Sequence, residues 1–131
     1  MGPTFLSSTL ADSPAVNATL AVHAWCAASP AAAGAVALAY INLGERAVAL
    51  ALGGGLPSTP RVEFFLEAPG GNLTADALLL NGAPLGVDAD GRLAAQPVPG
   101  AAVGAAGGGI SLPPLSYGFV VLSAARAPAC A

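Results

Sequence analysis

The sequence predicts an all-β protein, a single β-sandwich of about eight antiparallel strands. Short apolar segments recur along the chain, and residues typical of turns separate them: Gly, Pro, Asn and Asp. No segment keeps the apolar period of an amphipathic helix. The length of 131 residues fits one domain that buries its own core. Together these observations favour a β-sandwich over a helical or mixed fold.

The first half of the chain contains three expected strands. In the first, 20–27, alternate side chains point to opposite sides: Leu20, Val22, Ala24 and Cys26 to one, and Ala21, His23 and Trp25 to the other. The second, 36–43, is apolar on both sides, which predicts a central position in its sheet. A polar turn at 42–46 leads to the third strand, 47–52.

Glycine and proline residues separate the expected strands in the second half of the chain. The run 53–60 combines unrestrained Gly with Pro residues that lack an amide donor, so it is expected to be a loop. A strand at 62–67 follows, and the chain turns again at 69–72. The remaining expected strands lie at 77–80, 85–87, 110–112 and 117–124.

Three connections separate those last strands. Asn81-Gly82 is a strong hairpin signal between the first two of them. Asp88-Ala89-Asp90-Gly91 contains part of a calcium-loop pattern, but the other ligands and the closing Glu are missing, so a turn is the favoured interpretation. The segment 96–109, rich in Gly, Ala and Pro, is expected to be a loop.

The composition limits the possible partners. The formal net charge is −3, there is no Lys, and four Arg are dispersed along the chain: Arg46, Arg61, Arg92 and Arg126. Binding of nucleic acid or of a sulfated glycan requires clustered cations, so neither partner is expected here. Hydrophobic residues make up 55% of the chain, but 32 of them are Ala, so Leu, Val and a few aromatics must fill the core.

No transmembrane segment and no export signal are expected within the chain. The longest weakly charged stretch, 31–43, is too short to span about 30 Å of hydrocarbon as a helix. The N-terminus has neither the basic nor the apolar region of a secretory signal. Any export signal is therefore expected outside this chain.

The residue types that carry chemistry do not form a catalytic or metal site in the sequence. Glu63 and Glu67 lie on one expected strand with their Cα atoms about 13 Å apart, whereas the carboxyl groups of glycosidases are separated by about 5–9.5 Å. They are interpreted as solvated strand charges. His23 is the single histidine, which excludes a two-His metal site, and no cofactor is expected.

Two further features bear on the cellular compartment. Cys26 and Cys130 are either two unrelated buried thiols or one disulfide that joins the first core strand to the last. The sequons that begin at Asn17 and Asn72 are possible N-glycosylation sites. Both features favour a protein of the secretory pathway.

Four stretches, taken in order, resemble the end of heparanase-like proteins of glycoside hydrolase family 79, most closely the plant and algal type. They are Leu-Ala-Val-His-Ala-Trp-Cys at 20–26, Ala-Tyr-Ile-Asn-Leu at 39–43, Leu-Leu-Leu-Asn-Gly at 78–82, and Leu-Ser-Tyr-Gly-Phe-Val-Val at 115–121 with Pro-Ala-Cys-Ala at the end. Trp25 and His23 depart from the His and Tyr that are usual in the family at these positions. The resemblance covers essentially the whole chain.

The resemblance implies a domain organisation. Residues 1–18 resemble a lead-in segment that follows a (β/α)₈ catalytic barrel, and 19–131 resemble the C-terminal β-sandwich domain. The acid/base and nucleophile Glu of the family lie on that barrel, so neither maps onto this chain, which would be a fragment with Met1 an internal methionine. The resemblance also implies a Cys26–Cys130 disulfide.

The implied function is that of an accessory domain of a β-glucuronidase or endoglycosidase that hydrolyses glucuronide bonds in glycans. Its partners would be its own barrel and, through that barrel, a glycan substrate. The implied location is extracellular or cell wall, membrane-associated, or lysosomal or vacuolar. The alternative is a free-standing, non-catalytic sandwich that binds glycans or proteins. Because nearly all the aromatic residues lie inside expected strands, the accessory domain is favoured.

Overall fold

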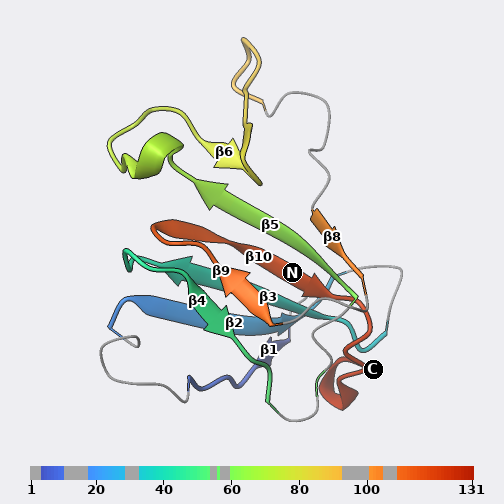
Figure 1. Ribbon diagram of the computed structural model, residues 1–131. Helices are drawn as coiled ribbons and strands as arrows, with labels where there is room; N and C mark the ends of the chain where they lie inside the picture. Colours follow the sequence, from blue (N-terminus) through green and yellow to red (C-terminus); the bar gives the residue numbers. More distant parts are fainter. Residues whose placement is uncertain are drawn as a thin grey trace.

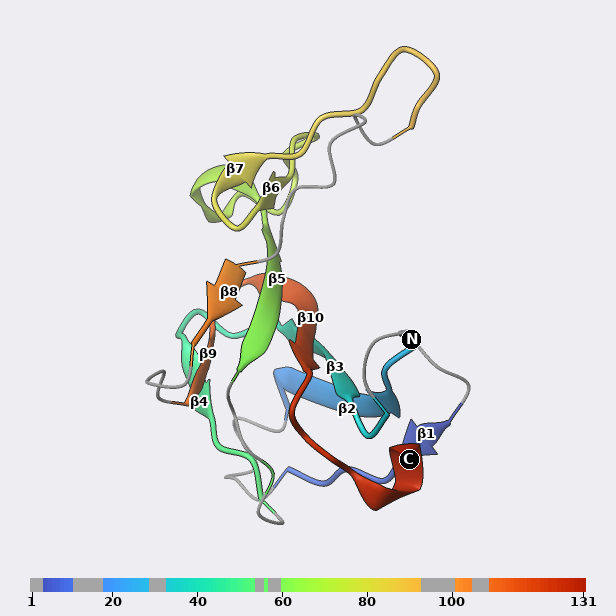
Figure 2. The ribbon, with the colours of Figure 1, turned by 90° about the vertical axis from the view of Figure 1, so that its right-hand side faces the viewer.

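The computed structural model describes residues 4–10, 18–28, 33–53, 56, 60–92, 101–104 and 109–131. In these ranges the protein is an antiparallel β-sandwich, as the sequence predicts. One layer is an eight-stranded sheet in which β1-β2-β3-β10-β5-β6-β7 are neighbours in this order and β8 also pairs with β5. The second layer is the two-stranded sheet β4-β9. Figure 1 shows β4 and β9 in front of the larger sheet, and Figure 2 shows the two layers from the side.

Four long strands form the centre of the larger sheet: β2 (Leu20–Cys26), β3 (Val36–Asn42), β5 (Arg61–Glu67) and β10 (Ser116–Leu122). The shorter strands are β1 (Phe5–Leu6), β4 (Val48–Leu50), β6 (Leu79–Leu80), β7 (Ala83–Pro84), β8 (Ala101–Val103) and β9 (Ile110–Leu112). Two 3₁₀ turns, η1 (Pro69–Gly71) and η2 (Pro128–Cys130), complete the described elements. The predicted strands of the described part are present, several of them shorter than expected, except the one at 85–87, which is wrong. The strand that follows the Asn81-Gly82 turn is β7 at Ala83–Pro84, because this two-residue turn places 83–84 directly opposite Leu79 and Leu80 of β6.

The alternation predicted for β2 is observed. Leu20, Ala24 and Cys26 are buried, whereas Ala21 and His23 are exposed. β3 lies between β2 and β10, as its apolar character on both sides predicts. Antiparallel register then carries this alternation from β2 across β3, β10 and β5, so the sheet has one inner and one outer face.

The core lies between the inner face and the two-stranded sheet. Its most completely buried side chains come from both layers and include Ile110 and Leu112 of β9 and Val36, Val120 and Leu122 of the larger sheet. Each of these five side chains is at most 1% exposed. Burial of branched aliphatic side chains from both sheets supplies the main driving force for folding.

Gly118 allows two aromatic rings to meet on the inner face. It lies directly between Tyr40 of β3 and Phe65 of β5 in the register of β10. The Tyr40 and Phe65 rings make an edge-to-face contact with centroids 5.8 Å apart. A Cβ atom at position 118 would collide with the carbonyl oxygen of Phe64 and come close to the Tyr40 ring. Glycine is therefore required there for packing.

Cys26 and Cys130 form a disulfide, with Cα atoms 5.2 Å apart. The bond joins the end of β2 to the C-terminal turn η2. Backbone hydrogen bonds fix the same region, because Gly34 N donates to the Cys130 carbonyl and Ala127 N donates to the Gly34 carbonyl. Gly34 has φ of +82°, and a Cβ atom there would meet the Arg126 backbone. A disulfide of this kind is typical of secreted and extracellular proteins.

Two further strands, β1 and β8, differ from the prediction. The predicted loop at 96–109 is wrong at Ala101–Val103, because these residues form β8 and pair with Arg61–Glu63. Within the predicted lead-in segment, Phe5 and Leu6 form β1 and pair with Trp25 and Ala24 of β2. Both strands are two or three residues long. Most of the predicted loop at 53–60 lies outside the described residues.

Candidate functional site

The outer face of the larger sheet is uncharged at its twelve central positions. Strand register places these positions in three rows, each crossing β2, β3, β10 and β5. The rows are Ala21-Ile41-Tyr117-Leu66, His23-Ala39-Phe119-Phe64 and Trp25-Ala37-Val121-Val62. No Asp, Glu, Lys or Arg stands among them. We refer to these twelve residues as the outer face.

Large apolar side chains on the outer face are accessible to solvent. Ile41 is 49% exposed and Tyr117 is 45% exposed. Phe64, Leu66 and Phe119 are half-buried. Antiparallel sheets that face water usually carry polar residues on that side, so an uncharged face with accessible aromatic and branched side chains indicates an interaction surface.

Three rings cluster where β1 meets the outer face. Phe5 of β1 lies opposite Trp25, and their rings make an edge-to-face contact with centroids 5.6 Å apart. The ring of His23 is 5.9 Å from that of Trp25 and 6.1 Å from that of Phe5. Phe5 remains 57% exposed. Sequence reasoning placed Trp25 on this side of β2 but did not predict that Phe5 would join it.

A shallow hollow extends the outer face at its other end. Its volume is about 190 Å³, and its lining includes Ile41, Leu43, Leu66, Leu73 and Tyr117. Leu43 and Leu73 are both more than 60% exposed. The apolar surface therefore continues past the ends of β3 and β5 to the connection between β5 and β6.

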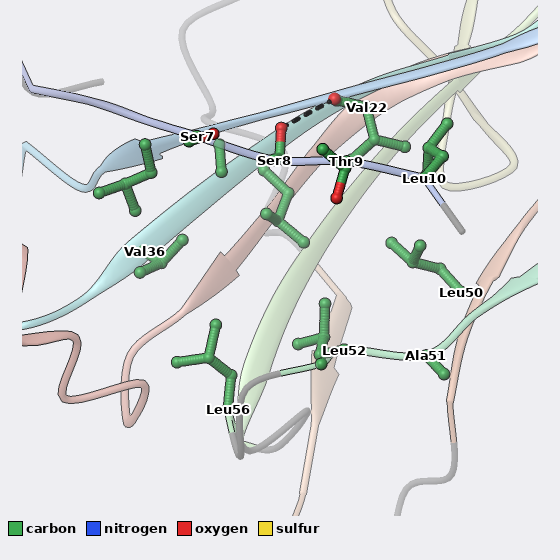
Figure 3. Close-up of a pocket in the computed structure, with 14 residues that line it drawn as sticks. Ser7, Ser8, Thr9, Leu10, Val22, Val36, Leu50, Ala51, Leu52 and Leu56 are labelled. Atoms are coloured by element: carbon green, nitrogen blue, oxygen red, sulfur yellow. Dashed lines mark hydrogen bonds between the residues drawn. The ribbon is translucent and has the colours of Figure 1, made fainter. Parts of the chain in front are cut away.

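A second apolar site lies between the two layers. This cleft of about 310 Å³ is bounded by the segment 6–10, by β2 and β3, and by residues 50–53 and 56 (Figure 3). Leu10, Val36, Leu50 and Leu52 contribute to its walls. On one side of the cleft, Ser8 Oγ donates a hydrogen bond to the Val22 carbonyl at 3.3 Å. None of the described residues that line this cleft is titratable.

The interpretation of Glu63 as a solvated charge is wrong. Glu63 is 9% exposed and its Oε1 lies 2.6 Å from Arg61 Nε, with Arg61 itself 6% exposed. Arg61 also donates from Nη2 to the Gly109 carbonyl. Two strand residues separated by one position lie on the same side, and Arg61 and Glu63 both face inward. That spacing, with opposite charges, was the signal in the sequence from which this pair could have been recognised.

Glu67 lies on the same inner side, opposite Ser116 of β10. Beside it, Tyr40 Oη is 3.1 Å from Ser116 Oγ, and Ser116 donates its own proton to the Pro113 carbonyl at 2.7 Å. Tyr40 therefore acts as the donor to Ser116. Burial, with smaller contributions from Glu67 and Glu63, raises the pKa of Tyr40 to about 12. The hydroxyl stays protonated at neutral pH and serves as a structural donor.

Replacement of Tyr40 by Phe is expected to destabilise the protein by about 1 kcal/mol at neutral pH, the typical contribution of one hydrogen bond. The pKa of Tyr40 is higher in the folded than in the unfolded chain, so its contribution is full below about pH 10 and is lost as the pH rises towards about 12. Denaturant unfolding from pH 7 to pH 11.5 should show the stability difference shrinking. Tyr117→Phe, at an exposed position, is the control, and parallel pH profiles for Tyr40→Phe and wild type would contradict the assignment.

The remaining candidate residues take structural positions. Asp88 Oδ1 accepts hydrogen bonds from Asp90 N and Arg92 N, so this segment is the predicted turn. Asn72 lies exposed after η1, whereas Asn17 lies outside the described residues. In the described part of the chain no three His, Cys, Asp or Glu side chains gather as metal ligands. The same residues include no helix long and apolar enough to cross a membrane.

Comparison with models of known protein families finds no match for this chain. Comparison with curated protein sequences finds no match either.

Proposed function

We propose that this β-sandwich is the C-terminal accessory domain of a heparanase-like glycoside hydrolase and packs through its outer face against the catalytic barrel of the same protein. In this assignment the barrel hydrolyses glucuronide bonds in glycans, and the sandwich holds the barrel in shape. The protein acts in the secretory pathway or outside the cell. The observation that supports this proposal is the uncharged outer face, on which Ile41 and Tyr117 are about half exposed.

The dimensions of the outer face fit an interdomain contact. Four strands spaced at about 4.8 Å and seven residues long at about 3.3 Å each make a surface of roughly 20 Å by 20 Å. Such a surface contributes on the order of 400 Å² from one side, and contacts between domains bury about 600–1,500 Å². The exposed ring of Phe5 enlarges the area beside β2.

The positions of the carboxylates agree with chemistry that is carried out elsewhere. Glu63 is held by Arg61 on the inner side of β5, and Glu67 follows four residues later on the same side of the same strand. Neither is among the described residues that line the cleft between the layers, and those residues include no carboxylate. An accessory domain needs no pair of catalytic carboxylates.

The isolated chain is expected to self-associate and to bind an apolar dye, because apolar patches above a few hundred Å² are uncommon on soluble monomers. The double substitution Ile41→Lys with Tyr117→Lys should abolish both properties. Val87→Lys is the matched control. Val87 is 64% exposed, but it follows β7, the strand at the edge of the sheet, and is not part of the outer face. Sedimentation at several concentrations and dye fluorescence provide the measurements.

Binding to a barrel tests the partner itself. A heparanase-like barrel produced without its own sandwich should form a stoichiometric complex with the wild-type chain and with the Val87→Lys variant, but not with the double variant. A monodisperse wild-type monomer that binds neither dye nor barrel would overturn the proposal. The free-standing module would then be the better assignment.

One observation favours the alternative, a glycan-binding module: the cluster of the exposed rings of Phe5 and His23 with the half-buried ring of Trp25. Rings that stack on sugars present a flat face, however, and here Phe5 and Trp25 meet edge to face at 81°. Affinity electrophoresis in gels containing neutral or acidic polysaccharides distinguishes the two functions. Retardation that disappears in Trp25→Ala would support the glycan-binding module, and unchanged mobility supports the accessory domain.

A further inference from the structure

We propose that Asn72 carries an N-linked oligosaccharide. This inference concerns a covalent modification and does not depend on the barrel or on the reaction proposed above. It rests on the side-chain contacts of the asparagines, on the local conformation of the sequon Asn72-Leu73-Thr74, and on its place at the surface.

The asparagines of the described residues differ in whether the side-chain amide nitrogen, Nδ2, donates a hydrogen bond. Asn42 is fully buried, and its Nδ2 donates to the carbonyls of Arg46 at 3.0 Å and Pro113 at 2.8 Å. Asn81 Nδ2 donates to the Glu63 carbonyl at 3.0 Å. Asn72 is exposed, and none of the described residues accepts a hydrogen bond from its Nδ2. Among the asparagines that the structure describes, Asn72 is therefore the one whose amide nitrogen is available to form a bond to a sugar.

The sequon is folded on itself. Thr74 N donates to Asn72 Oδ1 at 3.1 Å, and Thr74 Oγ1 donates to the same oxygen at 2.7 Å. Both bonds engage the amide oxygen and leave the nitrogen unrestrained. They span three residues, so this turn can form before the rest of the domain folds. That order suits a modification made on a chain that is still being synthesised.

The folded domain also has room for a sugar at this point. Asn72 follows η1, in which Gly70 and Gly71 have positive φ, and all three residues of the sequon are exposed. The Cys26–Cys130 disulfide indicates folding in an oxidising compartment, where N-linked oligosaccharides are attached in eukaryotic cells.

The transfer is chemically complete with one co-reactant, a lipid-diphosphate-linked oligosaccharide. Asn72 Nδ2 forms a bond to C1 of the first sugar while the bond from C1 to the diphosphate oxygen breaks. The electron pair of the broken bond leaves with the diphosphate, and one amide proton passes to a base of the transferase. No oxidation or reduction takes place.

The position of the glycan has a consequence for the outer face. Leu73, the middle residue of the sequon, is 65% exposed and lines the apolar hollow together with Ile41 and Leu43. An oligosaccharide on Asn72 lies next to Leu73 at the edge of this hollow and shields that side chain from other copies of the chain. Glycosylated protein should therefore self-associate less than protein without the sugar.

The test is peptide mapping by mass spectrometry of the full chain, secreted from a eukaryotic host behind a heterologous leader. Only the disulfide-bonded population is analysed, which ensures that the chain has passed through the oxidising compartment. The wild type should give a glycopeptide that contains Asn72, and an amidase that removes the sugar should convert this residue to Asp. Mapping separates this site from the sequon at Asn17.

Three variants define the requirement for Thr74. Asn72→Gln and Thr74→Ala should lose the glycopeptide, and Thr74→Ser, which keeps the hydroxyl, should retain it. An unmodified Asn72 peptide in the disulfide-bonded wild type would overturn the proposal, and so would a glycopeptide that persists in Thr74→Ala.

Discussion

Removal of the Cys26–Cys130 bond is expected to lower the free energy of unfolding by up to about 4.7 kcal/mol, the value that the chain-entropy model gives for a closed loop of about 100 residues. The two cysteines are 104 residues apart, so the bond closes nearly the whole domain. Its loss increases the conformational freedom of the unfolded chain more than a short-loop disulfide would. Urea unfolding of Cys26→Ala with Cys130→Ala, compared with the oxidised wild type, measures this difference.

The folded state should be affected at the C-terminus. Ala125 and Ala127 are buried in the core, and Gly34 holds η2 through its hydrogen bonds to Cys130 and Ala127. Hydrogen exchange should therefore increase first in 125–131 and next to Gly34 when the bond is absent. Cys26→Ala with Cys130→Ala in reducing buffer is the control for reductant effects. Equal stability of the double variant and the oxidised wild type would show that the bond contributes nothing.

Local sequence signals predicted the elements that are long and alternate regularly. In β2 the side chains at Leu20, Ala24 and Cys26 are buried, and strict period-two alternation carries that information in the sequence itself. The central place of β3 followed from its apolar residues on both sides, a pattern typical of a strand with neighbours on both edges. The turn at Asn81-Gly82 followed from the preference of these residues for positive φ, which both adopt.

Pairings between distant residues were not predictable in the same way. β1 and β8 contain two and three residues, too few for a period to be recognised, and each exists because a longer strand offers an unpaired edge. For the outer face, the sequence predicted apolar surface on the outer side of the early strands, including Trp25, and on the segment 5–10. Its extension across four strands depends on register, which no local pattern reports. The burial of Glu63 likewise depends on what lies opposite in β10 and β8.

Replacement of Arg61 by Met is expected to destabilise the protein by about 3–5 kcal/mol, the usual cost of removing one partner from a buried ion pair. Glu63 is 9% exposed, and Arg61 Nε at 2.6 Å is the cation that compensates its charge. In the variant, the carboxylate stays behind on the inner face beside Val120, which lies opposite it in β10. The penalty is the desolvation of a charge that no longer has this partner. Urea unfolding at neutral pH gives the difference in the free energy of unfolding.

The double substitution Arg61→Met with Glu63→Met separates this penalty from lost packing. Because it removes both charges and fills the same space with apolar atoms, it should cost far less than Arg61→Met alone, within about 1 kcal/mol of the wild type. Glu45→Ala, in the exposed turn after β3, is the control for loss of a solvated carboxylate and should change stability by less than about 0.5 kcal/mol. If Arg61→Met and the double variant are equally destabilised, the lost packing of the Arg61 side chain, rather than the stranded charge of Glu63, accounts for the effect.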